Sequence, residues 1–168
     1  MGAERELQRA IELNRSDAQA YLRYAGFLLE RKRLDEALDQ SQQAREFDPF
    51  SIESNLMTGR ILIELQLYDR AIQQLEKTED LDRNFAPARY YLGRAYQARG
   101  MFSDSIREFQ KAIFAAGPNP AFVAALGETY AASGRMDEAR AQLNELRRMA
   151  LSRQVSQELL DELQSKIR

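Results

Sequence analysis

Leu34-Asp35-Glu36-Ala37 is the stretch that decides the fold, because similar stretches return at a fixed distance along the chain. The equivalents are Tyr68-Asp69-Arg70-Ala71, Phe102-Ser103-Asp104-Ser105 and Met136-Asp137-Glu138-Ala139. The small residue that closes each stretch is 34 residues from the next, and Ala3 extends the same series toward the N-terminus. A constant period of this length is the signature of stacked structural repeats, so it has to be found before single elements are assigned.

Further columns of residues keep this period. One holds small residues, and another, three positions later, holds leucine or tyrosine: Ala25, Gly59, Gly93 and Gly127, then Leu28, Leu62, Tyr96 and Tyr130. Between breaks that contain proline, the segments are rich in good helix formers. Their apolar residues recur at three- and four-residue spacing, as in Ile106, Phe109 and Ile113. The sequence therefore predicts an all-α protein.

These columns resemble the tetratricopeptide repeat (TPR) family, and the resemblance covers nearly the whole chain. It implies a right-handed helical-repeat solenoid, the TPR superhelix, built of antiparallel helix pairs. We expect a single domain over residues 1–168. Its parts are a half repeat over 3–14, full repeats over 18–51, 52–85, 86–119 and 120–153, and a C-terminal capping helix over 154–168.

Several columns have a physical reason of their own. The small residues of the second column let the two helices of a pair approach closely, with Ala37, Ala71, Ser105 and Ala139 as the matching small face. Gly100 and Gly134 suit a left-handed residue after the first helix, a place that Lys32 and Gln66 take in other repeats. The second residue of each quoted stretch has a side-chain oxygen, which we expect to cap the second helix of the repeat. These residues are Asp35, Asp69, Ser103 and Asp137. The column in which the family favours tryptophan departs from the pattern and holds Tyr21, Asn55, Arg89 and Val123.

Composition removes several function classes. The chain lacks histidine and cysteine, which excludes imidazole bases, thiol nucleophiles and the usual zinc ligands. We therefore expect no enzyme, no cofactor and no metal. A net charge of −2 and the exact 34-residue period argue against a nucleic-acid partner. No apolar run approaches the length of a membrane span, so membrane insertion is not expected. The third and fourth repeats look bacterial, and we expect a cytoplasmic location with the periplasm as the alternative.

By analogy with the family, the first helices of the repeats line a concave groove. Its candidate partner-binding residues are Leu22, Met57, Arg60, Tyr90, Tyr91, Arg94 and Gln97, with Ala121, Ala124, Ala125 and Glu128 from repeat four. Arginine, tyrosine and methionine are enriched where protein surfaces bind. The favoured function is a non-catalytic scaffold for protein-protein interaction that holds a peptide or partner protein there. Each of these residues is equally well explained as solvated or packed against its neighbours.

The family resemblance suggests two other functions, of which the sequence argues against the first. The carboxylate clamp for chaperone tails needs lysine and asparagine at columns that here hold Leu22, Gly26 and Met57, so we expect no such adaptor. The alternative function is an oligomerisation or regulatory module of a larger protein. In that case the chain associates through its open N-terminal half repeat, with Leu7 and Ile11 as the candidate contact, in a homo-oligomer or a longer parent array.

Overall fold

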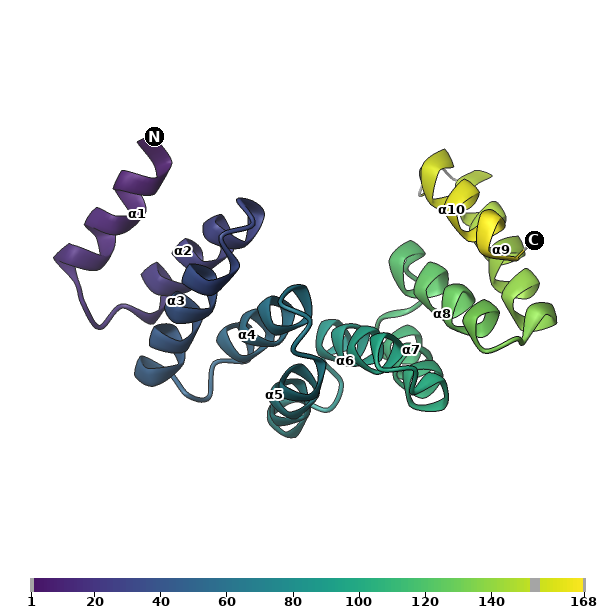
Figure 1. Ribbon diagram of the computed structural model, residues 1–168, viewed down its shortest axis with the longest axis horizontal. Helices are drawn as coiled ribbons and strands as arrows, with labels where there is room; N and C mark the ends of the chain where they lie inside the picture. Colours follow the sequence, from purple (N-terminus) through teal and green to yellow (C-terminus); the bar gives the residue numbers. More distant parts are fainter. Residues whose placement is uncertain (1, 152–154, 168) are drawn as a thin grey trace. The chain divides into compact units, whose positions relative to one another are not determined.

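A computed structural model describes residues 2–151 and 155–167 (Figure 1). Over these residues the chain forms ten α-helices and no β-strand, which confirms the all-α prediction. The helices are α1 (Gly2–Leu13), α2 (Ala18–Glu30), α3 (Leu34–Phe47), α4 (Ile52–Glu64), α5 (Tyr68–Leu81), α6 (Ala86–Ala98), α7 (Phe102–Ala116), α8 (Pro120–Ala132), α9 (Met136–Leu151) and α10 (Gln157–Ile167). The predicted capping helix is α10. Residues 152–154 and 168, where we expected repeat four to end and the cap to begin and end, lie outside the described residues.

The chain divides into two compact units, Met1–Arg83 and Asn84–Arg168, and each is described by itself. In the first unit α2 pairs with α3 and α4 with α5, while α1 packs on α2 and α3 on α4. Its core cluster holds Tyr24, Ala25, Leu28, Leu29, Ala37 and Ile61. In the second unit α6 pairs with α7 and α8 with α9, α7 packs on α8, and α10 contacts both α8 and α9. The larger residues of its core include Phe109, Leu126, Tyr130, Leu143, Leu146 and Leu163.

The turn inside each pair has the conformation that the sequence predicts. Lys32, Gln66, Gly100 and Gly134 have φ of 58°, 60°, 73° and 78°, so all four are left-handed. The residue after the left-handed one closes the turn with a backbone hydrogen bond. In the first repeat, the Arg33 amide donates to the Leu28 carbonyl over 3.0 Å. A lysine and a glutamine tolerate this conformation less readily than glycine. Two tight turns of the first unit are therefore held by their surroundings and not by intrinsic preference.

The predicted caps of the second helices are wrong. Asp35, Asp69, Ser103 and Asp137 lie inside the first turn of α3, α5, α7 and α9. The N-cap positions of α3, α5 and α7 are Arg33, Leu67 and Met101, and none of them makes a side-chain cap hydrogen bond. The turn is so short that the Arg33 carbonyl already accepts from the Ala37 amide. Asp35 and Asp69 in the first turn therefore favour their helices through the helix dipole and not as caps.

Side-chain caps occur instead at the start of several first helices. Asp17 accepts from the amides of Gln19 and Ala20, Ser51 accepts from that of Ser54, and Asn119 accepts from that of Ala121. The longer connections between repeats leave room for this geometry, in which an oxygen replaces the missing intrahelical acceptor.

The glycine column brings the helices of a pair together, as predicted, but its partners are large side chains. A Cβ on Gly93 would lie 2.7 Å from Phe109 Cε1, and one on Gly59 would lie 2.5 Å from Leu75 Cδ2. Phe109 and Leu75 are fully buried. The space at Gly59 and Gly93 is thus filled by a leucine and an aromatic ring of the second helix, while that at Gly127 is met by Leu163 of α10 and by Gln142 of α9.

Buried polar pairs replace the family's tryptophan in two repeats. Asn55 and Gln74 are buried, and the Gln74 side-chain amide donates to Asn55 Oδ1 over 2.6 Å. At the equivalent positions of the next repeat, Arg89 Nη1 lies 3.0 Å from Glu108 Oε2, and both side chains are at least nine-tenths buried. Each pair joins the first helix of a repeat to the second.

Substitution of Gly93 tests the close approach. Gly93→Ala places a methyl group against the buried ring of Phe109 and should lose about 1–3 kcal/mol of unfolding free energy relative to a matched control. Gly26→Ala is that control, because its Cβ would meet only Met57 Cε at 3.6 Å while gaining similar helix propensity. Urea denaturation followed by circular dichroism compares them, and equal stabilities would contradict the close packing of Phe109 on Gly93.

Removal of one partner tests the buried ion pair. Glu108→Ala leaves the Arg89 guanidinium buried without its carboxylate, and we expect a loss of about 3–5 kcal/mol in unfolding free energy. Asp137→Ala, which removes an exposed carboxylate paired with Arg140, should change it by less than about 1 kcal/mol. Similar losses in the two variants would show that Glu108 contributes no more than a surface charge.

Candidate partner-binding surfaces

One hollow of about 230 Å³ lies in the second unit, between α6, α8 and α10. Its lining residues are Tyr90, Arg94, Ala121, Ala124, Ala125, Glu128, Leu159, Glu162 and Lys166. The helix α8 contributes three alanines, whose small side chains leave this space open. Two predicted residues, Tyr90 and Arg94, thus come together with the predicted residues of repeat four.

Charges in the hollow are unevenly paired. Lys166 Nζ lies 3.0 Å from Glu128 Oε1 and 3.1 Å from Glu162 Oε1. Burial alone would lower the pKa of Lys166, but these two hydrogen bonds outweigh it and raise the pKa above its ordinary value. Arg94 is exposed, and its Nη1 donates to the Tyr90 hydroxyl over 3.2 Å. The arginine therefore has a neutral partner, while the lysine is matched by two carboxylates.

Tyr90 forms a wall of the hollow because aromatic neighbours hold its ring. The ring centroid lies 5.1 Å from that of Tyr91, 5.8 Å from that of Phe109 and 5.2 Å from that of Phe122. Tyr90 is half-buried, so one part of it belongs to the core and another part, with the hydroxyl, reaches Arg94. Such packing fixes the position at which the guanidinium is presented.

The other predicted groove residues lie outside this hollow. Tyr91 and Gln97 are half-buried on α6 of the second unit. Leu22, Met57 and Arg60 belong to the first unit, where Leu22 is only 9% exposed and Met57 packs against the core cluster. Sequence reasoning missed Leu159, Glu162 and Lys166 as lining residues. The sequence indicates their helix only as a cap, and no repeat column marks them.

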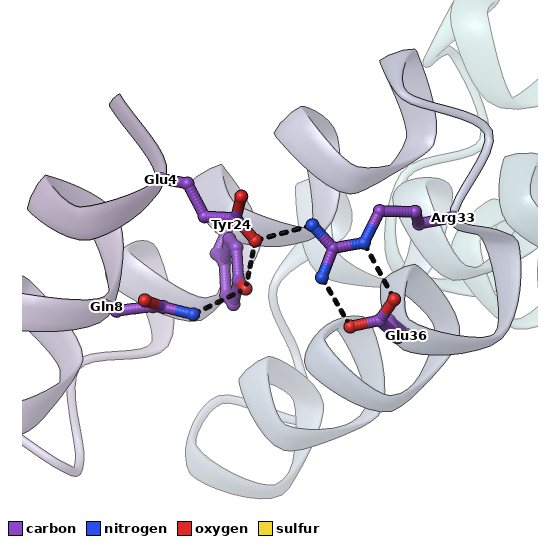
Figure 2. Close-up of polar contacts among 5 residues, drawn as sticks. All are labelled: Glu4, Gln8, Tyr24, Arg33 and Glu36. Atoms are coloured by element: carbon purple, nitrogen blue, oxygen red, sulfur yellow. Dashed lines mark hydrogen bonds and ion pairs between the residues drawn. The ribbon is translucent and has the colours of Figure 1, made fainter. Parts of the chain in front are cut away.

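The N-terminal helix α1 is tied to α2 and α3 by a polar network (Figure 2). The Tyr24 hydroxyl accepts from Gln8 Nε2 over 3.0 Å and donates to Glu4 Oε1 over 3.1 Å. Arg33 Nη1 lies 2.5 Å from the same Glu4 oxygen, and the guanidinium also pairs with Glu36. Glu4 and Gln8 thus point toward Tyr24, and Glu4 bridges it to Arg33.

Leu7 and Ile11, the predicted self-association residues, are half-buried and pack against the core cluster of the first unit. Ile11 lies on the side of α1 that carries Glu4 and Gln8, while Leu7 lies at the edge of that side. A charged substitution at either position would therefore also weaken the packing of α1 on the unit.

Over residues 2–151 and 155–167, no three Asp or Glu side chains gather in a way that could hold a metal ion. In the same residues, no helix combines the length and the hydrophobicity that a bilayer crossing requires.

The chain matches the sequence model described as "Tetratricopeptide repeat" over residues 1–52, 56–120 and 90–152. A search of curated proteins gives no significant match.

Solved structures with the same fold are numerous. TTC0263, a thermophilic TPR protein of Thermus thermophilus, is 20% identical with a TM-score of 0.82, and the match covers 98% of this chain and 89% of that one. MamA from Desulfovibrio magneticus RS-1 is 20% identical, with a TM-score of 0.74 and coverage of 90% and 85%. YrrB, described as a TPR protein with an unusual peptide-binding site, is 20% identical, with a TM-score of 0.70 and coverage of 96% and 90%. At these identities the likeness shows the fold alone, and it confirms the predicted helical-repeat class.

Acid should loosen α1. The hydrogen bond from Arg33, with that from Tyr24, lowers the pKa of Glu4 below its ordinary value of 4.5. Because the pKa of Glu4 is lower in the folded state, its carboxylate stabilises the folded state when the pH is above the pKa of the unfolded chain. This stabilisation is lost as the pH falls through the pKa of the folded state. At neutral pH, Glu4→Gln should therefore speed amide hydrogen exchange in α1, and the difference from wild type should shrink in acid.

The control for this experiment is Glu12→Gln on the exposed side of the same helix. It should leave exchange in α1 unchanged at both pH values. A Glu4→Gln effect of the same size in acid and at neutral pH would show that the carboxylate charge plays no part.

Proposed function

Because the chain belongs to the tetratricopeptide repeat family, we propose that it is a non-catalytic scaffold that binds a peptide or partner protein through the hollow of its second unit. Members of this family generally mediate protein-protein interactions. The observation that carries the proposal is the exposed Arg94, held by Tyr90 at the edge of a hollow with an alanine floor.

The chemistry of the hollow favours an acidic ligand. Lys166, Glu128 and Glu162 bind one another and together carry a charge of −1, so Arg94 is the lining cation whose hydrogen bond goes to a neutral group. Arg94 can exchange its hydrogen bond with a phenol for a charge-assisted one to a carboxylate, which is the stronger of the two. The alanines Ala121, Ala124 and Ala125 leave space for a neighbouring apolar or aromatic side chain. A segment with an acidic residue beside an apolar one fits both features.

The similar structure of YrrB is described as carrying a peptide-binding site, which supports a peptide as the ligand class. The proposed contact differs from a chaperone-tail clamp, because a single arginine and no lysine-asparagine set holds the carboxylate. A bacterial cytoplasmic location, with the periplasm as the alternative, belongs to the same proposal. The other function predicted from the sequence, self-association through the half repeat, concerns the separate surface of α1.

A peptide library tests the hollow. We would pan phage-displayed random peptides against the wild-type chain, Arg94→Glu and Lys77→Glu in parallel. Lys77 is exposed on α5 of the first unit, so its substitution makes the same charge change elsewhere. Wild type and Lys77→Glu should enrich peptides with acidic residues, and Arg94→Glu should lose them with its helix content unchanged. The absence of enrichment, or equal enrichment by Arg94→Glu, would refute the proposal.

A further inference from the structure

Arg94 and Glu128 occupy the same place in two neighbouring first helices. They lie one 34-residue period apart, Arg94 on α6 and Glu128 on α8. The two helices contact each other, and both residues line the hollow of the second unit. Because opposite charges attract each other, an ion pair between the two helices is the arrangement to expect.

The structure pairs these two residues with other groups instead. Glu128 Oε1 lies 3.0 Å from Lys166 Nζ of α10, and Arg94 Nη1 donates to the Tyr90 hydroxyl over 3.2 Å. Within residues 2–151 and 155–167, Arg94 forms no ion pair with Glu128. Burial alone would lower the pKa of Arg94, but Tyr90 and the negative charge of Glu128 raise it above its ordinary value. The carboxylate is therefore close enough to act on the guanidinium without binding it.

Lys166 reaches Glu128 because α10 packs on α8. Leu163 of α10 is fully buried and lies over Gly127, where a Cβ would come within 2.9 Å of Leu163 Cδ2. Ile167, next to Lys166, is also buried. A second contact, of 3.1 Å to Glu162 Oε1 on the same helix, holds the ammonium group at the edge of the hollow. The packing of α10 thus places a cation beside the carboxylate of α8.

This cation changes the charge that a ligand meets. The hollow is lined by two cations, Arg94 and Lys166, and by two carboxylates, Glu128 and Glu162, so its lining has no net charge. Without Lys166 the lining would carry −1. Glu128, whose side chain is only 15% exposed, would then have Arg94 as the remaining cation of the hollow. A ligand carboxylate would have to compete with Glu128 for the guanidinium.

We propose that Lys166 makes the hollow selective for an acidic ligand, because it holds Glu128 away from Arg94 and leaves the guanidinium to the ligand carboxylate. Lys166 is thus a positioning residue, which acts on the ligand through Glu128. This inference rests on the function proposed above, since it concerns the ligand of the same hollow. It makes α10 a part of the binding site as well as a cap.

The probe is the acidic peptide that panning on wild type enriches most, synthesised with a fluorescent label. Fluorescence anisotropy measures its binding to the full chain and to the variants. Lys166→Met keeps an apolar stem but removes the charge, and it should weaken binding by about fivefold or more. Glu128→Gln should strengthen binding. Glu162→Gln should strengthen it less, because that side chain is 54% exposed and its charge is better screened.

The opposite signs separate the charge of Lys166 from a structural role. Lys166→Met and Glu128→Gln break the same contact between α10 and α8, so a purely structural role predicts that both change binding in the same direction. Lys166→Met should also weaken binding less in the Glu128→Gln background than in wild type, because no carboxylate remains on α8 for the lysine to hold.

Arg140→Met is the matched control. It removes the cation of an exposed ion pair with Asp137, outside the hollow, and should leave binding unchanged. Circular dichroism checks that each variant keeps its helices.

Failure of this inference is distinguishable from failure of the proposed function. If wild type enriches no acidic peptide, the proposed function is wrong, and the role of Lys166 is refuted with it. The role of Lys166 alone is refuted by an acidic peptide that needs Arg94 but whose affinity Lys166→Met and Glu128→Gln change in the same direction or not at all. An equal loss of affinity in Arg140→Met would refute it as well.

Discussion

Phe109 packs its ring on a residue that has no side chain, Gly93, and the arrangement of α6 and α7 depends on this contact. The ring is fully buried, and a single methyl group on the glycine would overlap with it. Because the contact fixes how closely the axes approach, it also brings the residues on either side into register. The pairing of Arg89 with Glu108 lies within the same helix pair and relies on that register. Leu75 and Gly59 have the same relation in α4 and α5.

Most of the fold was predictable because its constraints are local and repeated. The helices, their pairing and the left-handed turns at Lys32 and Gln66 follow from a period that any one repeat would show only weakly. The prediction of N-caps for the second helices was wrong for a geometric reason. Asp35 has the side chain of an N-cap, but the preceding turn ends so early that the helix has already begun. Sequence shows which residue can cap, while the length of the turn decides whether it is in place.

The candidate site was less predictable. Arg94 and Tyr90 belong to the predicted groove, but their grouping with Lys166 depends on how α10 packs, which the repeat period does not encode. In the sequence, Asn55 and Arg89 are only departures from a tryptophan column. A signal was present, because Gln74 and Glu108 share a column of their own and polar residues in two columns can satisfy one another. In the folded chain, the two departures from the tryptophan column are buried, and each pairs with a polar side chain of the second helix.

The two polar pairs also distinguish one helix from another while the chain folds. Repeats of similar sequence invite exchanged partners, a known route by which repeat proteins misassemble. If α4 packed on α7, Glu108 would face the amide of Asn55 in place of the Arg89 guanidinium. If α6 packed on α5, Arg89 would face the neutral amide of Gln74 in place of the Glu108 carboxylate. The charged pair in one repeat and the amide pair in its neighbour thus favour the pairing of α4 with α5 and of α6 with α7 over the exchanged pairing.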